Sequence, residues 1–291
     1  MERREFLWKS AITAGLLSTQ SLPNPVLAET IPVQKKYAND IVTLGNTGIE
    51  VSRLAMGTGT HGVNKHSSQT RKLGIKGVAR LLKAAYEKGI SFWDSADQYG
   101  THPHLKEALT LVPRDKVVIL SKTHATTAEE MKADLDRFRE ELNTDYIDIL
   151  LLHFMTDPQW PQIKVGAMEV LERAREDGII RAHGVSCHTL GALKAAAESD
   201  WVQVDLARIN YAGVVMDDGV DTIAPILNKM HGQGKGIIGM KIFGAGQLRN
   251  HVDKALNFVL NLDSVDAFTI GQENQKEMFD LIERIPNASV S

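Results

Sequence analysis

The stretch YIDILLLH, residues 146–153, is an apolar run of the kind that forms a strand buried on both faces, as in a parallel sheet. The next patterned segment, VGAMEVLERAREDG (165–178), has the apolar spacing of a helix and ends at Gly178. A strand followed by a helix is the repeating unit of α/β folds. The fold class therefore depends on how many such units the chain contains.

Seven further strand–helix units flank this one, with no break in composition between them. The expected strands span residues 53–57, 90–94, 116–123, 181–188, 201–208, 236–243 and 266–271. The helices that follow them span residues 78–89, 104–112, 128–143, 190–199, 222–234, 252–262 and 276–285. A hairpin around GNTG, residues 41–52, precedes the first unit. Eight consecutive units favour a (β/α)8 TIM barrel with an N-terminal β-hairpin over an open, doubly wound sheet.

One motif favours the open, doubly wound sheet. Gly57, Gly59 and Gly62 have the G-x-G-x-x-G spacing of a dinucleotide-binding turn. That turn must open directly into a helix. Here it runs into VNKHSSQTRKLG, residues 63–74, which we interpret as a polar loop of a barrel.

The composition is that of an ordinary globular protein. Of 291 residues, 43% are hydrophobic and 24% are charged, and the net charge is −3. This charge gives no reason to expect a nucleic-acid or an anionic membrane partner. Cys187 is the only cysteine, so an internal disulfide and a thiolate metal cage are both excluded.

The N-terminal segment, residues 1–28, resembles a twin-arginine export signal. Paired arginines, Arg3 and Arg4, precede an uncharged stretch, and Ala28 is one of the small residues that signal peptidase requires. The resemblance implies the twin-arginine export machinery as a partner, a periplasmic or otherwise exported protein, and no stable membrane span after the signal is removed. If this segment is instead a frayed amphipathic terminus, the protein is cytoplasmic. A polar linker is expected at residues 29–40, and the barrel at 41–291.

Barrel enzymes place their chemistry where strands end and helices begin. Three adjacent apolar runs, FWD, VVILSK and ILLLH, end on ionisable residues: Asp94, Lys122 and His153. One such residue is usually a satisfied structural group, but three on neighbouring strands favour a site. Other polar residues expected at this end are Tyr99, Ser121, Thr123, Ser186, Cys187, His188, Gln203, Asp205 and Lys241.

Four of these residues suggest proton transfer. Asp94 and Lys122 come from neighbouring strands and are expected to form an ion pair. A lysine beside a phenol stabilises the phenolate, so we expect Lys122 to lower the pKa of Tyr99. A phenol with such a pKa donates a proton to a carbonyl oxygen, which His153 can orient through a hydrogen bond.

The motifs DSADQYG (94–100), SKT (121–123), DILLLH (148–153) and GVSCH (184–188) resemble those of the aldo-keto reductases. The resemblance covers nearly the whole chain after the linker. It implies an NAD(P)-dependent oxidoreductase that passes hydride to an aldehyde or ketone. By position, Asp94, Tyr99, Lys122 and His153 match the catalytic tetrad of that family.

The resemblance also implies contacts to NADP(H) or NAD(H), and no metal. They are Gly57 and Thr58; Ser186, Cys187 and Gln203 around the carboxamide; Met240 and Lys241; the backbone of Gly244, Ala245, Gly246, Gln247 and Leu248 around the pyrophosphate; and Gly271, Glu273 and Lys276 after the last strand. Two residues depart from the family pattern. Cys187 replaces the usual asparagine, and Met240 replaces the tyrosine that stacks on the nicotinamide.

Cofactor preference is ambiguous in the sequence. Family members that prefer NADP usually place basic residues after the last strand, where this chain has Glu273 and Glu277 with only Lys276 positive. An acid opposes a 2′-phosphate but accepts from a 2′-hydroxyl. We therefore expect little discrimination between NADPH and NADH.

Two other functions fit part of the pattern. A metal-dependent barrel hydrolase would use histidines of the mouth; the candidates are His61, His102, His104, His124, His153 and His188. The His102-x-His104 spacing suits zinc, but a proline separates the two in what we expect to be a loop. The departures at Cys187 and Met240 also suit a barrel that binds nicotinamide without catalysis.

Overall fold

The computed structural model describes residues 34–290 of the chain. The expected export signal, residues 1–28, lies outside the described residues, so export stays a prediction. Within residues 34–290, no helix is both long enough and apolar enough to cross a membrane.

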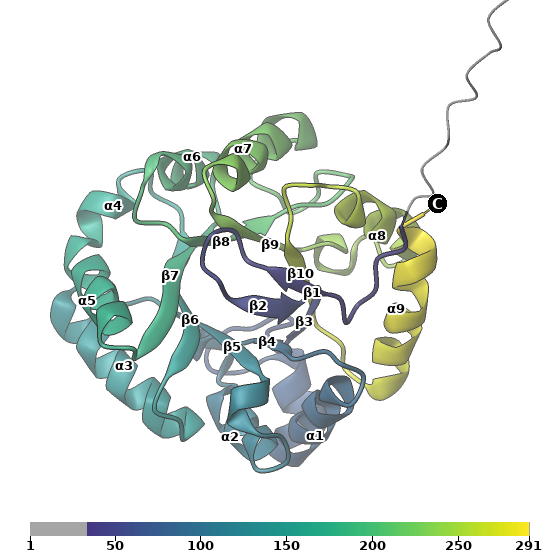
Figure 1. Ribbon diagram of the computed structural model, residues 1–291, viewed down its shortest axis with the longest axis horizontal. Coiled ribbons are helices and arrows are strands. Elements are labelled where there is room, and N and C mark those ends of the chain that lie inside the picture. The colour runs from purple at the N-terminus through teal and green to yellow at the C-terminus, as the bar shows by residue number, and fades with distance from the viewer. Residues whose placement is uncertain (1–33, 291) are drawn as a thin grey trace, which may run out of the picture. The chain divides into compact units, whose positions relative to one another are not determined.

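Eight parallel strands close into a barrel in the order β10-β3-β4-β5-β6-β7-β8-β9, which confirms the predicted TIM-barrel fold (Figure 1). The strands are β3 (Leu54–Gly57), β4 (Phe92–Asp94), β5 (Val118–Thr123), β6 (Ile147–Met155), β7 (Ile180–Cys187), β8 (Val204–Arg208), β9 (Gly236–Met240) and β10 (Ala267–Ile270). Helices surround them: α1 (Ser68–Tyr86), α2 (His102–Leu109), α3 (Ala128–Leu142), α4 (Trp160–Ile163), α5 (Val165–Glu176), α6 (Leu190–Glu198), α7 (Val220–Gly232), α8 (Val252–Leu260) and α9 (Gln275–Ala288).

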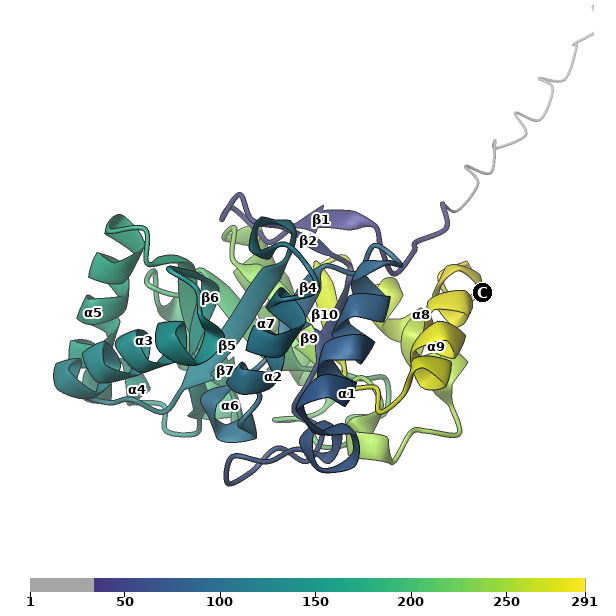
Figure 2. The ribbon, with the colours of Figure 1, turned by 90° about the horizontal axis from the view of Figure 1, so that it is seen from below.

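The predicted hairpin covers one end of the barrel. Its strands, β1 (Ile41–Thr43) and β2 (Glu50–Ser52), pair antiparallel and lie across the strand ring (Figures 1 and 2). Leu44, Ile49 and Val51 join the apolar core inside the barrel, and the amide of Asn46 donates to the carbonyl oxygen of Gly234, 2.7 Å away, just before β9. The hairpin thus closes the amino-terminal end of the strands and leaves the carboxyl end as the open mouth.

Strand periodicity decides which side chains reach the inside of that mouth. Phe92, Leu120 and Leu151 belong to the inner core. Successive strand residues point to opposite faces, so the residues two positions later also point inward. These are Asp94, Lys122 and His153, and the three predicted strand-end residues therefore converge on one space.

Several boundaries differ from the prediction. Helix α1 begins at Ser68 rather than at residue 78, because the side chains and backbones of Ser67 and Thr70 form a capping box. The polar loop is therefore shorter than predicted, and a left-handed Gly74 (φ 61°) marks a kink in the helix. Strand β8 begins at Val204 rather than at residue 201. The first shift shortens the loop at the mouth, and the second leaves Gln203 outside the strand, at its amino-terminal end.

Candidate active site

The predicted ion pair forms at the base of the mouth. The ammonium of Lys122 contacts Asp94 Oδ1 and also donates to the carbonyl oxygen of Ser95 at 2.6 Å. The second carboxylate oxygen of Asp94 accepts from the hydroxyl of Thr269, 2.9 Å away. Lys122 is 0% exposed and Asp94 6%, so both charges are removed from water and depend on these partners. Thr269, on β10, was not predicted, because nothing in AFTI distinguishes its threonine from an ordinary strand residue.

Tyr99 lies over this pair, at the end of the short 3-10 helix η1 (Asp97–Tyr99) that follows β4. The ammonium nitrogen of Lys122 is 4.9 Å from the centroid of its ring, and the ring of His153 stands nearly perpendicular to it at a centroid distance of 5.7 Å. The four predicted catalytic residues therefore meet in one cluster.

The predicted direction of the Tyr99 pKa shift is wrong. Burial raises the pKa of the Tyr99 phenol above its ordinary value, and the negative charge of Asp94 raises it further. Lys122 cannot reverse this, because its ammonium is already bound to Asp94 and to Ser95. The phenol therefore keeps its proton through the neutral range, as a proton donor requires.

His153 is the neutral partner of this cluster. Burial, and then the positive charge of Lys122, hold the pKa of its imidazole well below the usual range. Its Nδ1 is buried with no hydrogen-bond partner among residues 34–290. The ring of His124 lies beside it at a centroid distance of 4.8 Å. A neutral imidazole can still donate one N–H bond to an oxygen in the mouth.

A charged network fixes the helix that carries Tyr99. Asp97, at the start of η1, pairs with Arg137 of α3 at 2.7 Å. Arg137 also pairs with Glu141 at 3.0 Å, and Glu141 lies 2.6 Å from His102 Nδ1. The other nitrogen of that ring, His102 Nε2, lies 2.7 Å from the hydroxyl of Ser121.

The same contacts weaken the zinc hypothesis. Donor atoms of Asp97, His102 and Glu141 lie within 4.8 Å of one another. However, the guanidinium of Arg137 already pairs with both carboxylates, and the ammonium of Lys65 also pairs with Asp97. Both ring nitrogens of His102 have protein partners. The His102–His104 segment also begins helix α2 and is not the predicted loop.

Two of the predicted carboxamide contacts are wrong. Cys187 points away from the mouth, because it packs with Val185 in the core between the barrel and the helices, and burial raises the pKa of its thiol. Gln203 precedes β8 and accepts from the backbone amide of His183 at 3.3 Å, so it lies away from the carboxyl ends of the strands. Ser186 has the inward register, and its hydroxyl accepts from the amide of Phe154 at 3.0 Å.

Arg208 occupies the position that was predicted for Gln203, since it is the last residue of β8. Its guanidinium donates to the carbonyl oxygen of His188 at 2.7 Å and to Asp217 at 2.8 Å. The expected strand, residues 201–208, also ended at Arg208, so the rule that strand-end polar residues form the site pointed to Arg208, which was not among the candidates.

Asp205 of β8 is a buried acid that points away from the inside of the barrel, because its neighbours Val204 and Leu206 belong to the inner core. Neither of its carboxylate oxygens has a nitrogen or oxygen donor among residues 34–290, and the thiol of Cys187 is the polar group that interacts with it. Burial, and then the charge of Asp217, raise its pKa to about 8. An unfolded aspartate has a pKa of about 3.9. Between these values the unfolded chain releases a proton that the folded chain retains, so this residue costs more stability as pH rises from 4 to 8.

We therefore expect Asp205→Asn to stabilise the protein, and more at pH 8 than at pH 5. A gain of about 1–3 kcal/mol at pH 8 is expected, because asparagine has no proton that unfolding would release between pH 4 and pH 8. Urea unfolding at both pH values measures it. Asp145→Asn, at an exposed acid, is the matched control. A gain that is equal at the two pH values would contradict the raised pKa.

The loop after β3 and the end of β10 use their predicted cofactor residues for packing. The hydroxyl of Thr58 donates to the carbonyl oxygen of Asp94 at 2.9 Å and contacts Thr101 Oγ1 at 3.0 Å. A β-carbon on Gly57 would lie 2.9 Å from Thr269 Oγ1, and one on Gly271 would lie 2.1 Å from Thr60 Oγ1. These glycines let the strand ends approach closely.

The turn after β9 has the unusual backbone of a binding loop. Lys241, Gly244, Ala245 and Gly246 all have left-handed φ angles, of 59°, 53°, 53° and 93°. Left-handed backbone at a non-glycine residue is costly and is often found at functional sites. The amides of Gly244, Gly246, Gln247 and Leu248 donate to carbonyls inside the turn, so fewer amides point outward than the predicted phosphate cradle needs.

Two side chains of the same segment face the mouth. Met240 belongs to the inner core. Lys241 is half-buried, and burial, and then the charge of Arg208, lower the pKa of its ammonium. No carboxylate of residues 34–290 forms an ion pair with Lys241, which leaves a positive charge free for an anionic ligand.

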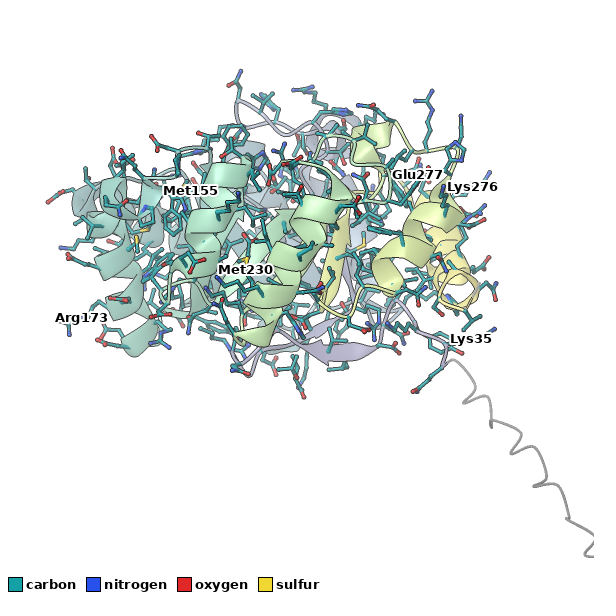
Figure 3. The ribbon with its side chains drawn as sticks, turned by 90° about the horizontal axis from the view of Figure 1, so that it is seen from above. Lys35, Met155, Arg173, Met230, Lys276 and Glu277 are labelled. Carbon is teal, nitrogen blue, oxygen red and sulfur yellow. The ribbon has the colours of Figure 1, made fainter. Side chains whose placement is uncertain are left out.

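The residues after β10 lie at the mouth end of α9, where Figure 3 shows Lys276 and Glu277. Glu273 forms an ion pair with Lys72 of α1. Glu277 accepts from the amide of Glu273 at 2.9 Å and from the side chain of Asn274, the N-cap of α9, at 2.7 Å. Glu277 is thus a capping residue, and Lys72 is a basic neighbour that the sequence prediction missed.

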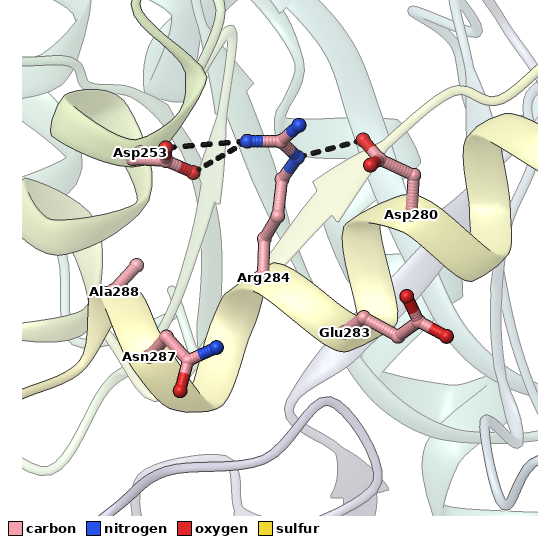
Figure 4. Close-up of a pocket in the computed structure, with 6 residues that line it drawn as sticks. All are labelled: Asp253, Asp280, Glu283, Arg284, Asn287 and Ala288. Atoms are coloured by element: carbon pink, nitrogen blue, oxygen red, sulfur yellow. Dashed lines mark hydrogen bonds and ion pairs between the residues drawn. The ribbon is translucent and has the colours of Figure 1, made fainter.

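A cleft on the outer surface is separate from the cluster of Tyr99, Lys122, Asp94 and His153. It has a volume of about 390 Å³ and lies between α8 and α9, where Arg284 pairs with Asp253 and Asp280 (Figure 4). Neither helix contributes a catalytic candidate to it. We therefore assign no role in the chemistry to this cleft.

Known proteins resemble this chain in sequence and in fold. Residues 53–282 match the aldo/keto reductase family. The chain is 24% identical to the aldo-keto reductase AFTS1 of Alternaria alternata, with 85% of this chain and 76% of that protein aligned. It is 35% identical to the methylglyoxal reductase YeaE of Escherichia coli over 47% of this chain and 46% of that protein, about half of each. The holo form of aldo-keto reductase AKR11C1 from Bacillus halodurans has the same fold, with a TM-score of 0.66 at 17% identity over 87% of this chain and 91% of that chain.

Proposed function

Because the chain belongs to the aldo/keto reductase family, a family of oxidoreductases, we propose that it reduces an aldehyde or ketone to the alcohol with NADP(H) or NAD(H). The observation that carries this proposal is the cluster at the mouth, in which Tyr99 lies over the buried Lys122–Asp94 pair and beside a neutral His153. Carbonyl reduction needs a proton donor at the carbonyl oxygen, and a neighbouring hydrogen-bond donor orients that oxygen; Tyr99 and His153 suit these two tasks.

Each residue of the cluster has a separate task. Tyr99 gives its proton to the carbonyl oxygen as the alcohol forms, which its raised pKa permits at neutral pH. His153 donates a hydrogen bond to that oxygen and orients it. Lys122 stabilises the negative charge that Tyr99 carries after it has given up its proton, until the phenolate takes a new proton from water. Asp94 fixes Lys122 beneath the ring.

The residues around the mouth fit a nicotinamide dinucleotide. Lys241, with no carboxylate partner among the described residues, would pair with the pyrophosphate, beside the left-handed turn at Gly244–Gly246. Met240 would contact the nicotinamide ring through its thioether, and Ser186 would hold the carboxamide. The bound cofactor supplies the hydride that adds to the carbonyl carbon.

Binding and turnover separate this proposal from its rivals. We expect NADPH or NADH to bind the protein and to be consumed when a panel of aldehydes is added. Binding without turnover on any aldehyde would support the non-catalytic barrel. Stoichiometric zinc with hydrolytic activity would support the metal-dependent hydrolase and overturn this proposal.

We infer the cofactor preference from the ion pair between Lys72 and Glu273 at the rim of the mouth. Lys72 offsets part of the charge of Glu273, so a 2′-phosphate meets neither a basic pocket nor an isolated acid. We expect NADPH and NADH to differ in affinity by less than about tenfold, or under 1.4 kcal/mol. Glu273→Arg should shift the preference toward NADPH by about 1–2 kcal/mol, the worth of a charge-assisted hydrogen bond.

Fluorescence titrations at fixed ionic strength measure this shift. Glu283→Arg makes the same charge change at an exposed position of α9 and is the control. A wild-type preference for NADPH of about a hundredfold would contradict the assignment.

A further inference from the structure

The glycines of the loop after β3 surround the ring of Tyr99. A β-carbon on Gly59 would lie 2.1 Å from Tyr99 Cε2, and one on Gly62 would lie 2.2 Å from Tyr99 Cδ1. Non-bonded carbon atoms pack at about 3.5–4.0 Å. Any side chain larger than hydrogen at either position therefore has to displace the ring.

Backbone conformation does not explain these two glycines. Gly59 and Gly62 are absent from the positive-φ residues of the described chain, whereas Gly74, farther along in α1, has a left-handed φ of 61°. An alanine is compatible with the backbone at both positions. The feature that demands glycine is the close approach of the Tyr99 ring.

The two glycines contact opposite sides of the ring. Gly59 faces the side with Cδ2 and Cε2, whereas Gly62 faces the side with Cδ1 and Cε1. The ammonium of Lys122 lies 4.9 Å from the centroid of the same ring. The ring is thus confined by the loop and by the catalytic lysine together.

Hydrogen bonds hold the loop against η1. The amide of Lys65 donates to the carbonyl oxygen of Gln98 at 2.9 Å, and the side chain of Gln98 donates to the carbonyl oxygen of Gly62 at 3.3 Å. On the other side, the buried Gln69 accepts from the amide of Thr60 at 3.2 Å. The loop and the helix that carries Tyr99 therefore form one fixed unit.

We propose that Gly59 and Gly62 form a slot that positions Tyr99 for proton transfer. The proposal rests on carbonyl reduction as the function and gives the G-x-G-x-x-G motif a task other than binding phosphate. Gly59 and Gly62 are positioning residues, because they act through the ring and touch no reacting atom.

The test uses Gly59→Ala and Gly62→Ala in the full chain. A misplacement of about 1 Å can cost on the order of 10²-fold in rate, so we expect kcat to fall by about 10- to 100-fold in each variant. Cofactor affinity and KM should stay near the wild-type values. Gly232→Ala, where a β-carbon would meet nothing within 4 Å, is the matched control and should retain kcat.

Two double variants show whether the effect passes through Tyr99. In a Tyr99→Phe background the ring remains but its proton is gone, so Gly59→Ala should lower kcat by less than a further twofold or so. Because the new β-carbon has to displace the ring, Gly59→Ala should lower the melting temperature of the wild-type chain. In a Tyr99→Ala background the ring is gone, so the same substitution should not lower it. This thermal measurement needs no bound cofactor and also applies if Gly59→Ala alone folds poorly.

The outcomes separate the slot from the function. A wild-type protein that binds the cofactor and reduces no carbonyl would overturn the proposed function. Active wild-type protein with full kcat in both glycine variants would overturn the slot alone. So would losses that multiply with Tyr99→Phe, or a melting-temperature loss that persists without the ring.

Discussion

We expect Tyr99→Phe to reduce aldehydes about 10²- to 10⁴-fold more slowly than the wild-type protein, the usual contribution of a general acid. The substitution keeps the ring that fits between Gly59 and Gly62 and removes only the proton. Cofactor affinity should not change, because no predicted cofactor contact is lost. Steady-state rates and cofactor titrations measure the two quantities separately.

The pH dependence sharpens this prediction. The pKa of Tyr99 is raised by burial and by Asp94, so the wild-type phenol stays protonated up to at least its ordinary value of about 10. The ratio of wild-type to Tyr99→Phe rates should therefore be constant from pH 6 to about pH 9. Tyr86→Phe, in α1, is a control for the loss of a hydroxyl elsewhere. Equal rates in wild-type and Tyr99→Phe protein would remove Tyr99 from the mechanism.

The second large effect is on stability. Lys122→Met should lower the free energy of unfolding by about 3–5 kcal/mol, the typical cost of removing one partner of a buried pair. Lys122 is 0% exposed, and its loss leaves Asp94 with the hydroxyl of Thr269 as its remaining side-chain partner among residues 34–290. Activity should fall as well, because the phenolate of Tyr99 loses its nearby cation. Chemical unfolding gives the free energy directly.

Two variants test whether the stability loss comes from the stranded carboxylate. Adding Asp94→Asn to Lys122→Met removes the uncompensated charge, so part of the stability should return while the activity stays low. Lys116→Met breaks an ion pair with Asp115 whose side chains are 61% and 69% exposed, and it should cost less than about 1 kcal/mol. An unchanged free energy of unfolding in Lys122→Met would contradict a buried pair.

The strand-end residues were predictable from the sequence for a physical reason. Asp94, Lys122 and His153 each end a run of apolar residues, where a polar side chain can face the open mouth instead of the apolar core. Period-two alternation then places all three inside the mouth. Thr269, which holds the second oxygen of Asp94, carries no such signal, because threonine is an ordinary strand residue.

The eighth strand along the chain shows how one boundary error misplaces a site. Trp201 and Val202 resemble the start of a strand, but β8 begins at Val204. Gln203 therefore precedes the strand, away from the mouth, whereas Arg208 ends both the expected strand and β8 and was passed over as a candidate. The predicted carboxamide contact of Cys187 was wrong because Cys187 follows Ser186, which points inward, and must itself point to the opposite face of the strand.

The pKa shift of Tyr99 and the contacts of the loop after β3 could not be predicted from the sequence. The sign of the Tyr99 shift depends on burial and on the ammonium of Lys122 already being bound to Asp94. Neither can be judged from the order of residues. The contact of Gly59 and Gly62 with Tyr99 joins segments that only the folded barrel brings together. Their spacing in the sequence instead suggested a dinucleotide turn.

Transfer of labelled hydride tests the central claim most directly. The full chain is incubated with an aldehyde and with nicotinamide cofactor deuterated at the reactive carbon, in ordinary water, and the alcohol is analysed by mass spectrometry. The account predicts alcohol with one deuterium on the carbinol carbon and an ordinary proton on oxygen, and a rate that falls with Tyr99→Phe. Bound cofactor that stays unoxidised, with no labelled alcohol from any aldehyde of the panel, would contradict it.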